Sequence, residues 1–276
     1  MEEITAEYSS NQLVPTQELR VKAIATVAAK TDLGRVRENN EDKFEFYVPE
    51  DDDRLASRGQ VYIVCDGMGG HAAGQIASEL SVKTFIDVYY SHPADNPETA
   101  MTAAVVAANR FVNDVGRAVP ARKGMGTTLS ALVLLQEKAY TVQVGDSRIY
   151  RLRNGELLML THDHTWVDDA LRAGLISEAE AENHPYKHVL TRAIGGDVEV
   201  KPDIASDDIQ VGDVYLLCSD GLINHVSDDV IGEVLRTKVP SEAAWNLVGQ
   251  ALQGGGSDNT TVQIVRIDAL LKPVTI

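Results

Sequence analysis

Four aspartates stand at the ends of short apolar runs that lie far apart in the sequence. They are Asp66, Asp146, Asp220 and Asp258. A single aspartate at a strand end is most often a turn residue. Four such carboxylates on converging strand ends would repel one another, and only cations would keep the cluster ionised. The pattern therefore predicts a cation-binding site where strand ends meet.

The available side chains indicate which cation would bind. The sequence has no Cys-x-x-Cys and no His-Glu-x-x-His motif, so zinc is disfavoured. Carboxylates, a carbonyl and water are hard ligands that suit Mg²⁺ or Mn²⁺. Two such ions sharing a carboxylate can activate a water molecule and clamp the oxygens of an in-line displacement, which is typical of phosphoryl transfer. Arg37, near Glu41 and Asp42, is a candidate for binding the phosphate.

The segment around Asp66 holds the densest glycine cluster of these four sites. Residues 61–65 are predicted to form a buried strand that ends at Asp66, and Gly67, Gly69, Gly70 and Gly74 follow. Glycines allow the backbone to approach a ligand closely. Taken alone, the segment is equally typical of a strand-to-helix turn with a capping aspartate.

The composition disfavours several classes of partner. The 276 residues carry a formal net charge of −16, which disfavours nucleic acid and anionic membrane surfaces as partners. No signal-peptide pattern opens the chain, and no run approaches the roughly 20 apolar residues of a membrane helix. Cys65 and Cys218 are expected to be buried free thiols, with a disulfide as the less favoured alternative. We therefore expect a cytoplasmic protein.

The elements that must position these residues follow from the apolar periodicity. Strands are predicted over residues 21–30, 44–48, 61–65, 129–135, 140–144, 148–152, 156–160 and 260–267, with a strand pair in 209–219. Helices are predicted over 72–90, 98–115, 228–237 and 241–252. Residues 50–60 are expected to form an acidic surface turn, and 129–160 a β-meander. This order predicts an α+β fold in which helices cover antiparallel sheets.

Six short motifs occur in a fixed order along the chain. They are Arg37-Glu-Asn-Asn-Glu-Asp42, Asp66-Gly-Met-Gly-Gly70, Gly126-Thr-Thr128, Gly145-Asp-Ser-Arg148, Ser219-Asp-Gly221 and Ser257-Asp-Asn259. This series resembles the ordered motifs of the metal-dependent serine/threonine protein phosphatases of the 2C family, in their short bacterial form. The resemblance covers about residues 21–267.

The resemblance implies a fold and a domain organisation. The fold is a central β-sandwich of two antiparallel sheets flanked by pairs of α-helices, with a helical flap insertion at about residues 161–193. The phosphatase domain would span residues 21–270, preceded by an N-terminal tail at 1–20. Two short helices are expected within the flap, at 166–173 and 177–182.

The resemblance also implies a role for each candidate residue. Asp66 resembles the carboxylate that bridges two metals, and Gly67 the carbonyl ligand of one of them. Asp220 and Asp258 resemble the remaining ligands of the first metal. Glu41 would reach the second metal through water with Asp42 in the outer shell, Asp146 would hold a third metal together with Asp220, and Arg37 would bind the phosphate.

The implied activity is hydrolysis of phosphoserine and phosphothreonine in proteins. A hydroxide bridging two Mn²⁺ or Mg²⁺ ions would attack the phosphorus in line and release inorganic phosphate. The expected partners are phosphorylated proteins, the substrates of a serine/threonine kinase, and the chain is expected to be a monomer. Neither nucleic acid nor a membrane is expected as a partner.

One position departs from the animal members of the family. Where they carry a histidine after Asp-Gly as the proposed general acid, this sequence has Met68, which cannot donate a proton. A water on a third metal near Asp146 is the preferred donor, and His71 is the second candidate. The four histidines at 162, 164, 184 and 188 are interpreted as flap structure, and Gly126-Thr-Thr128 as a packing feature under the site.

Two other classes of function remain as alternatives. A phosphoprotein sensor without turnover would keep the fold, although degenerate members are expected to lose metal-site aspartates and none is missing here. An acidic Ca²⁺-binding structural protein is disfavoured because its carboxylates would cluster in one short loop.

Overall fold

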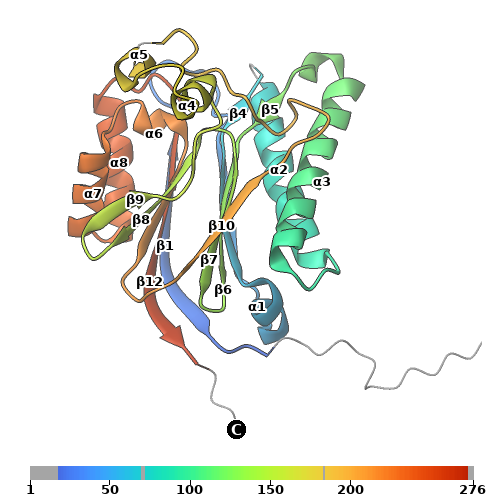
Figure 1. Ribbon diagram of the computed structural model, residues 1–276, viewed down its shortest axis with the longest axis vertical. Coiled ribbons are helices and arrows are strands. Elements are labelled where there is room, and N and C mark those ends of the chain that lie inside the picture. Colours follow the sequence, from blue (N-terminus) through green and yellow to red (C-terminus); the bar gives the residue numbers. More distant parts are fainter. Residues whose placement is uncertain (1–17, 70–71, 183, 273–276) are drawn as a thin grey trace, which may run out of the picture.

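Two five-stranded antiparallel sheets lie face to face at the centre of the molecule, with helices on both outer faces (Figure 1). The computed structural model describes residues 18–69, 72–182 and 184–272. The first sheet has the strand order β1-β12-β11-β8-β9 and the second β10-β7-β6-β3-β2. A short two-stranded sheet joins β4 and β5. The predicted α+β fold, a β-sandwich flanked by helix pairs, is confirmed.

The strands are β1 (Lys22–Asp32), β2 (Lys43–Tyr47), β3 (Gln60–Cys65), β4 (Gly67–Met68), β5 (Gly126–Thr127), β6 (Leu129–Leu135), β7 (Lys138–Val144), β8 (Arg148–Arg153), β9 (Glu156–Met159), β10 (Asp203–Asp208), β11 (Val214–Cys218) and β12 (Thr260–Leu271). The helices are α1 (Asp52–Arg58), α2 (Ala72–Ser91), α3 (Pro97–Ala118), α4 (Trp166–Arg172), α5 (Glu178–Glu182), α6 (Asp220–Ile223), α7 (Asp228–Thr237) and α8 (Pro240–Gln253), with a 3₁₀ turn η2 (Pro120–Arg122). No helix among these described elements is long and apolar enough to cross a membrane.

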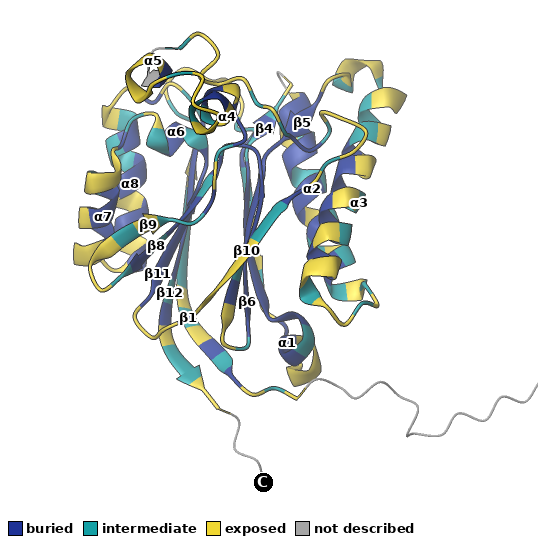
Figure 2. Cartoon of the chain, in the orientation of Figure 1, coloured by how far each residue is buried: buried dark blue, intermediate teal, exposed yellow. Residues whose placement is uncertain are grey.

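Side chains that alternate in direction along each strand explain why a sheet can pack against helices on one face and against the other sheet on the opposite face. In β3, Val61 and Ile63 face the core under α2 and α3, whereas Tyr62 and Val64 face the core between the sheets. Successive side chains of a strand point to opposite faces, so a strand covered on both faces is apolar throughout. The burial colouring shows the result, with dark central strands and pale outer helix faces (Figure 2).

The second helix pair covers the other sheet by the same rule. Leu216 of β11 packs with the buried residues of α7 and α8, and Leu217 packs into the layer between the sheets. Each helix pair thus closes one outer face of the sandwich. The short helices α4, α5 and α6 lie at one end of the sandwich, where the flap is (Figure 1).

Three local predictions were wrong. Residues 52–58 form α1 rather than a turn, because Asp51 caps Arg54 N–H and Gly59 ends the helix at a φ of 66°. Residues 129–160 are not one meander, since β7 and β8 belong to different sheets. Residues 209–219 hold only β11, and β10 lies earlier and pairs with β7 across the other sheet.

Candidate metal centre

Asp66 follows the last residue of β3, and the loop beside it holds its backbone from both sides. Its N–H donates to Thr128 Oγ1 at 2.8 Å, and its carbonyl accepts from Thr128 N at 2.9 Å and from Thr127 Oγ1 at 2.8 Å. The Gly126-Thr-Thr128 motif therefore fixes the backbone from which the Asp66 carboxylate projects. This is the supporting role predicted for it.

Asp146 lies in the turn that carries the chain from one sheet to the other. Ser147 Oγ hydrogen bonds to Thr128 Oγ1 at 2.7 Å, so the turn shares its support with Asp66. Gly145 has a φ of +100°, and a Cβ there would lie 2.6 Å from Thr128 Cγ2. The glycine is required by both backbone conformation and close packing.

Asp220 opens α6 directly after β11, and Asp258 lies in the loop before β12. Between them, Gly221 packs on the Asn259 backbone so closely that a Cβ would lie 2.0 Å from its carbonyl oxygen. Asp220 Oδ2 accepts a hydrogen bond from Asn224 Nδ2 at 3.1 Å. The Asp-Gly pair thus brings two strand ends together because the second residue has no side chain.

Asn259 ties the loop at residues 33–41 to the same place. Its Oδ1 accepts from Glu41 N at 2.8 Å, and its Nδ2 donates to the carbonyls of Leu33 at 2.9 Å and Asn39 at 3.0 Å. Sequence reasoning quoted Asn259 in a motif but gave it no role. An amide that bridges two loops has no local signature, and only the tertiary arrangement shows its function.

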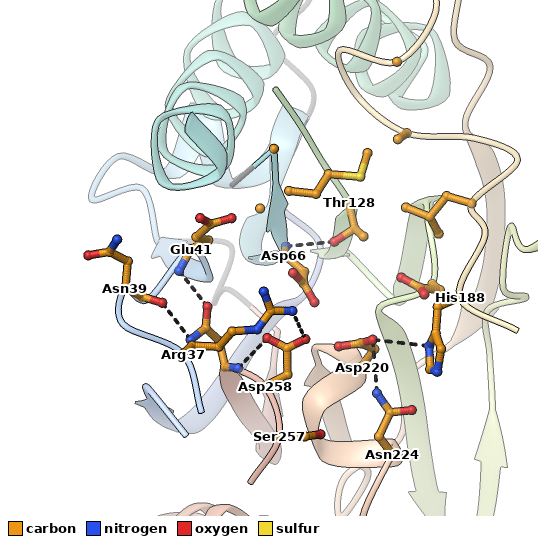
Figure 3. A pocket seen from close by; sticks show the side chains of 18 of the residues that line it. Arg37, Asn39, Glu41, Asp66, Thr128, His188, Asp220, Asn224, Ser257 and Asp258 are labelled. Carbon is orange, nitrogen blue, oxygen red and sulfur yellow. Dashed lines mark hydrogen bonds and ion pairs between the residues drawn. The ribbon is translucent and has the colours of Figure 1, made fainter. Parts of the chain in front are cut away.

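Arg37 projects from that loop toward Asp258, whereas the Glu41 carboxylate points away from Asp258 (Figure 3). Arg37 Nη2 donates to Asp258 Oδ2 at 2.7 Å, and this bond raises the pKa of Arg37 above its usual value. The Glu41 carboxylate lies against the first turn of α2, where a Cβ on Gly74 would be 2.1 Å from Glu41 Oε2. The absence of a side chain at position 74 makes room for this carboxylate.

These residues line one cavity of about 1140 Å³. Six of the seven metal-site candidates from the sequence border it, together with the candidate phosphate ligand: Arg37, Glu41, Asp66, Gly67, Asp146, Asp220 and Asp258. Asp42 does not border the cavity. It is 6% exposed, and its carboxylate accepts a hydrogen bond from Ser219 Oγ at 2.7 Å, so it lies behind the cavity wall.

The carboxylates of the cavity destabilise one another's charged form. Burial is the largest cause that raises the pKa of Asp66 well above its usual range, and the charges of Asp42 and Asp220 add to it. Burial and the charge of Asp220 raise the pKa of Asp146 to about 7. The pKa of Asp42 is also raised to about 7, mainly by burial. A cation among these groups would favour their ionised forms.

The donor set fits a hydrated hard cation. Within residues 18–69, 72–182 and 184–272, no three Asp, Glu, His or Cys side chains form a group that holds a metal ion by itself. Asp220 Oδ1 is buried without a hydrogen-bond partner in this described part. Mg²⁺ keeps several water ligands and binds through few carboxylates. The side chains therefore suit ions whose shells are completed by water and the Gly67 carbonyl.

The histidines of the flap take different places. His188 lines the cavity with Nδ1 4.0 Å from Asp220 Oδ2, whereas the His184 ring stacks on Trp166 at 4.6 Å. His164 is buried and accepts from Gly145 N at 3.1 Å. His188 was missed as a cavity residue because its position depends on how the flap folds back. His71 lies outside the described residues.

The sequence matches the family model described as Protein phosphatase 2C over residues 29–260. It is 38% identical over 248 residues to the serine/threonine protein phosphatase PstP of Mycobacterium tuberculosis, covering 90% of this chain and 46% of that protein. The chain thus spans about half the length of this relative. It is also 38% identical over 248 residues to the serine/threonine phosphatase stp of Listeria monocytogenes, covering 88% and 96% of the two chains.

The fold is shared with solved structures of similar proteins. The catalytic domain of a PstP, solved in complex with two manganese ions, superposes with a TM-score of 0.76 at 37% identity and covers 89% of this chain and 99% of that one. The range matched by the family model, residues 29–260, contains Arg37 and all the candidate metal ligands.

Proposed function

The chain belongs to the protein phosphatase 2C family, and on that premise we propose that it is a metal-dependent protein serine/threonine phosphatase. The observation that carries the proposal is the single cavity in which Asp66, Asp146, Asp220 and Asp258 meet beside Arg37. Its substrates are proteins that carry phosphoserine or phosphothreonine. The two manganese ions of the related PstP structure support a two-metal centre here.

Asp66, Asp220 and Asp258 would hold the first ion, Asp66 and, through water, Glu41 would hold the second, and the Gly67 carbonyl would be a ligand of one of the two. Bound Mn²⁺ or Mg²⁺ supplies an activated water nucleophile and neutralises charge on the phosphoryl oxygens. Asp42 would act from outside the ligand shell. Its carboxylate accepts a hydrogen bond from Ser219 Oγ and thereby anchors the end of β11. A third ion at Asp146 and Asp220 is part of the same proposal.

Arg37 positions the phosphoryl group. Its guanidinium has five N–H donors, and the bond from Nη2 to Asp258 fixes the direction of the planar group. The remaining donors are free to bind two phosphate oxygens in the bidentate manner that suits arginine. The carboxylate that orients Arg37 is thus a candidate metal ligand, which places phosphate and metal side by side.

The leaving alkoxide needs a proton from a group other than Met68. Met68 borders the cavity but its thioether has no proton to give. We assign proton donation to water near Asp146, with His71 as the second candidate. Asp146 is held in place for this by the shared support of its turn and of Asp66.

The wider organisation follows from the same proposal. Residues 21–270 form the phosphatase domain, 161–193 the flap and 1–20 a tail, most of which lies outside the described residues. The protein acts in the cytoplasm as a monomer on substrates of a serine/threonine kinase. Its charge of −16 disfavours nucleic acid and anionic membranes as partners.

Phosphate release from a phosphothreonine peptide tests the proposal. With Mn²⁺ we expect turnover that stops on addition of EDTA and returns when Mn²⁺ is restored in excess. Phosphotyrosine peptide and a small phosphoester serve as comparison substrates. Tight binding of the peptide without phosphate release would favour the sensor alternative and overturn the proposal.

A further inference from the structure

A second cavity of about 330 Å³ lies beside the metal cavity and is bordered by residues of the flap. We call it the flap cavity. It is bordered by Arg148, Asp163, Thr165, Val167, Asp168, Leu171, Glu178, Ala181, Lys187 and Ile223, and by four residues shared with the metal cavity, Asp146, His188, Asp220 and Asn224. The two cavities are therefore adjacent and share part of one wall.

The flap folds as one unit over this space. Its two ends run side by side, with Trp166 N donating to Val189 O at 2.9 Å and Thr191 N donating to His164 O at 2.8 Å. Thr165 caps α4 by accepting from Asp168 N. The helix is therefore held at its start, and its apolar side chains Val167 and Leu171 border the cavity.

One part of the wall of the flap cavity is apolar. Val167 and Ala181 are each 7% exposed, and Leu171 and Ile223 lie beside them as partly buried side chains. These four come from three separate helices, α4, α5 and α6. An apolar wall with access to solvent gains free energy when a further apolar group covers it.

Two carboxylates of this cavity already have arginine partners. Arg148 Nε and Nη2 donate to the two carboxylate oxygens of Asp163 at 3.0 and 2.7 Å, and these side chains are 24% and 14% exposed. Asp168 pairs with Arg172 at 2.9 Å. Beside the apolar part of the wall, Asp163 and Asp168 are therefore already engaged and do not await a lysine, and Arg148 does not await a glutamate.

A neutral apolar side chain is the group that this cavity fits. Its volume lies at the lower end of the range for small-ligand sites, roughly 300–1,000 Å³, so it suits one side chain better than a folded partner. Consecutive residues of an extended chain are about 3.3–3.6 Å apart. A peptide whose phosphate lies among the aspartates of the metal cavity would therefore pass the shared wall within a few residues.

We propose that the flap cavity is a substrate subsite for an aliphatic side chain, such as leucine or methionine, one to three residues from the phosphorylated residue. The inference rests on the proposed phosphatase function. It goes beyond that function because it gives the flap a defined selectivity, set by the apolar wall of Val167, Leu171, Ala181 and Ile223. The occupant belongs to the same molecule as the phosphate because the two cavities are adjacent and share a wall.

Phosphothreonine peptides in an alanine background test the subsite. Leucine, lysine or glutamate replaces alanine at one of the three positions on either side, and kcat/KM is measured with Mn²⁺. We expect leucine to raise kcat/KM about tenfold over alanine at one position, mainly through KM, since a hydrophobic pocket discriminates by about this factor. Lysine and glutamate at that position should give no gain.

Two variants test whether the leucine preference arises in the flap cavity. Val167→Phe fills the cavity and should reduce the leucine-to-alanine ratio to about one. Leu171→Ala enlarges it and should shift the preference toward phenylalanine, which keeps the test decisive if Val167→Phe does not fold. Val211→Phe makes the same change at a 60% exposed position outside the cavity and should leave the ratio unchanged.

The outcomes separate the subsite from the activity. Phosphate release with no leucine preference at any position would overturn the subsite and leave the phosphatase proposal standing. A leucine preference that survives both cavity variants, or a preference for lysine or glutamate instead, would also overturn it. No release from any peptide or from a small phosphoester would overturn both.

Discussion

The metal cavity and the flap cavity differ in how their carboxylates are paired. In the metal cavity, carboxylates from different strand ends face one another, and the pKa values of Asp66 and Asp220 are raised by burial and by their neighbours. In the flap cavity, Asp163 and Asp168 each have an arginine partner. The wall between the two cavities is formed by the four residues that border both, Asp146, His188, Asp220 and Asn224.

The difference teaches what each space is suited to bind. Repelling carboxylates are stable in the ionised form only when cations join them, so the metal cavity is incomplete by itself. Asp163 and Asp168 have arginine partners and need no further counter-ion, so we expect the apolar part of the flap cavity to select by shape and apolarity. The supports differ too, since close backbone contacts at glycines hold the first cavity, and backbone hydrogen bonds between the two ends of the flap hold the second.

Removing one carboxylate from the metal cavity should have the largest effect. Asp220→Asn keeps the shape of the side chain but takes away the charge at the wall shared by both cavities. We expect kcat for a phosphothreonine peptide with Mn²⁺ to fall by at least about a hundredfold, the scale found when a group that stabilises transition-state charge is lost. Asp229→Asn, an exposed change on α7, is the control and should retain activity. Equal activity of the two variants would contradict the proposed roles.

Metal binding should stabilise the fold through the same carboxylates. An ion that binds only the folded state adds about 2.7 kcal/mol at a concentration of 100 times its Kd, so Mn²⁺ should raise Tm and EDTA should reverse the shift. Burial and the charge of Asp220 raise the pKa of Asp146 from its ordinary value of about 4 to about 7. The folded, metal-free protein therefore binds more protons than the unfolded chain between these values, and its stability in EDTA should fall as the pH rises through that window.

Denaturant unfolding at several pH values tests whether the free energy of unfolding in EDTA falls as the pH rises. With saturating Mn²⁺ the decline between pH 5 and 8 should disappear, because the bound ion replaces the protons. A free energy of unfolding in EDTA that rises with pH over this range would contradict the repulsion inferred for the cluster.

The sequence made the metal cavity more predictable than the flap cavity, for a physical reason. An aspartate after a buried strand is visible in the local pattern, as at Asp66, and the strand period predicts the layers on either side of it. Which sheet a strand joins is not local, so the switch at Asp146 and the true partner of β10 were not predictable. Contacts such as those of Asn259 and the position of His188 depend on chain segments that meet only in the folded state.

A glycine-to-alanine pair tests whether backbone contact sets the metal cavity. In Gly221→Ala the new Cβ would lie 2.0 Å from the Asn259 carbonyl oxygen, so the strand ends must separate. We expect a loss of at least about 2 kcal/mol in the free energy of unfolding, in the range for strain in a packed site. Gly249→Ala on α8 meets nothing within 4 Å, and should stabilise the helix by roughly 0.5–1 kcal/mol. Similar values for both variants would mean that the contact at Gly221 is not tight.

The smallest effect should come from breaking a charge pair in the flap cavity, and it tests the comparison most directly. Asp163→Asn leaves Arg148 without its carboxylate partner, so the cavity loses one negative charge beside the guanidinium. At the peptide position that favours leucine, glutamate should then gain about threefold to tenfold in kcat/KM, since a partly exposed pair is worth about 1 kcal/mol or slightly more. Arg148→Met leaves Asp163 unpaired and should favour lysine instead. Because the two variants change the same pair in opposite directions, general damage to the fold would not reproduce opposite shifts in preference. A shift of the same sign in both would show that the pair does not control the selectivity of the flap cavity.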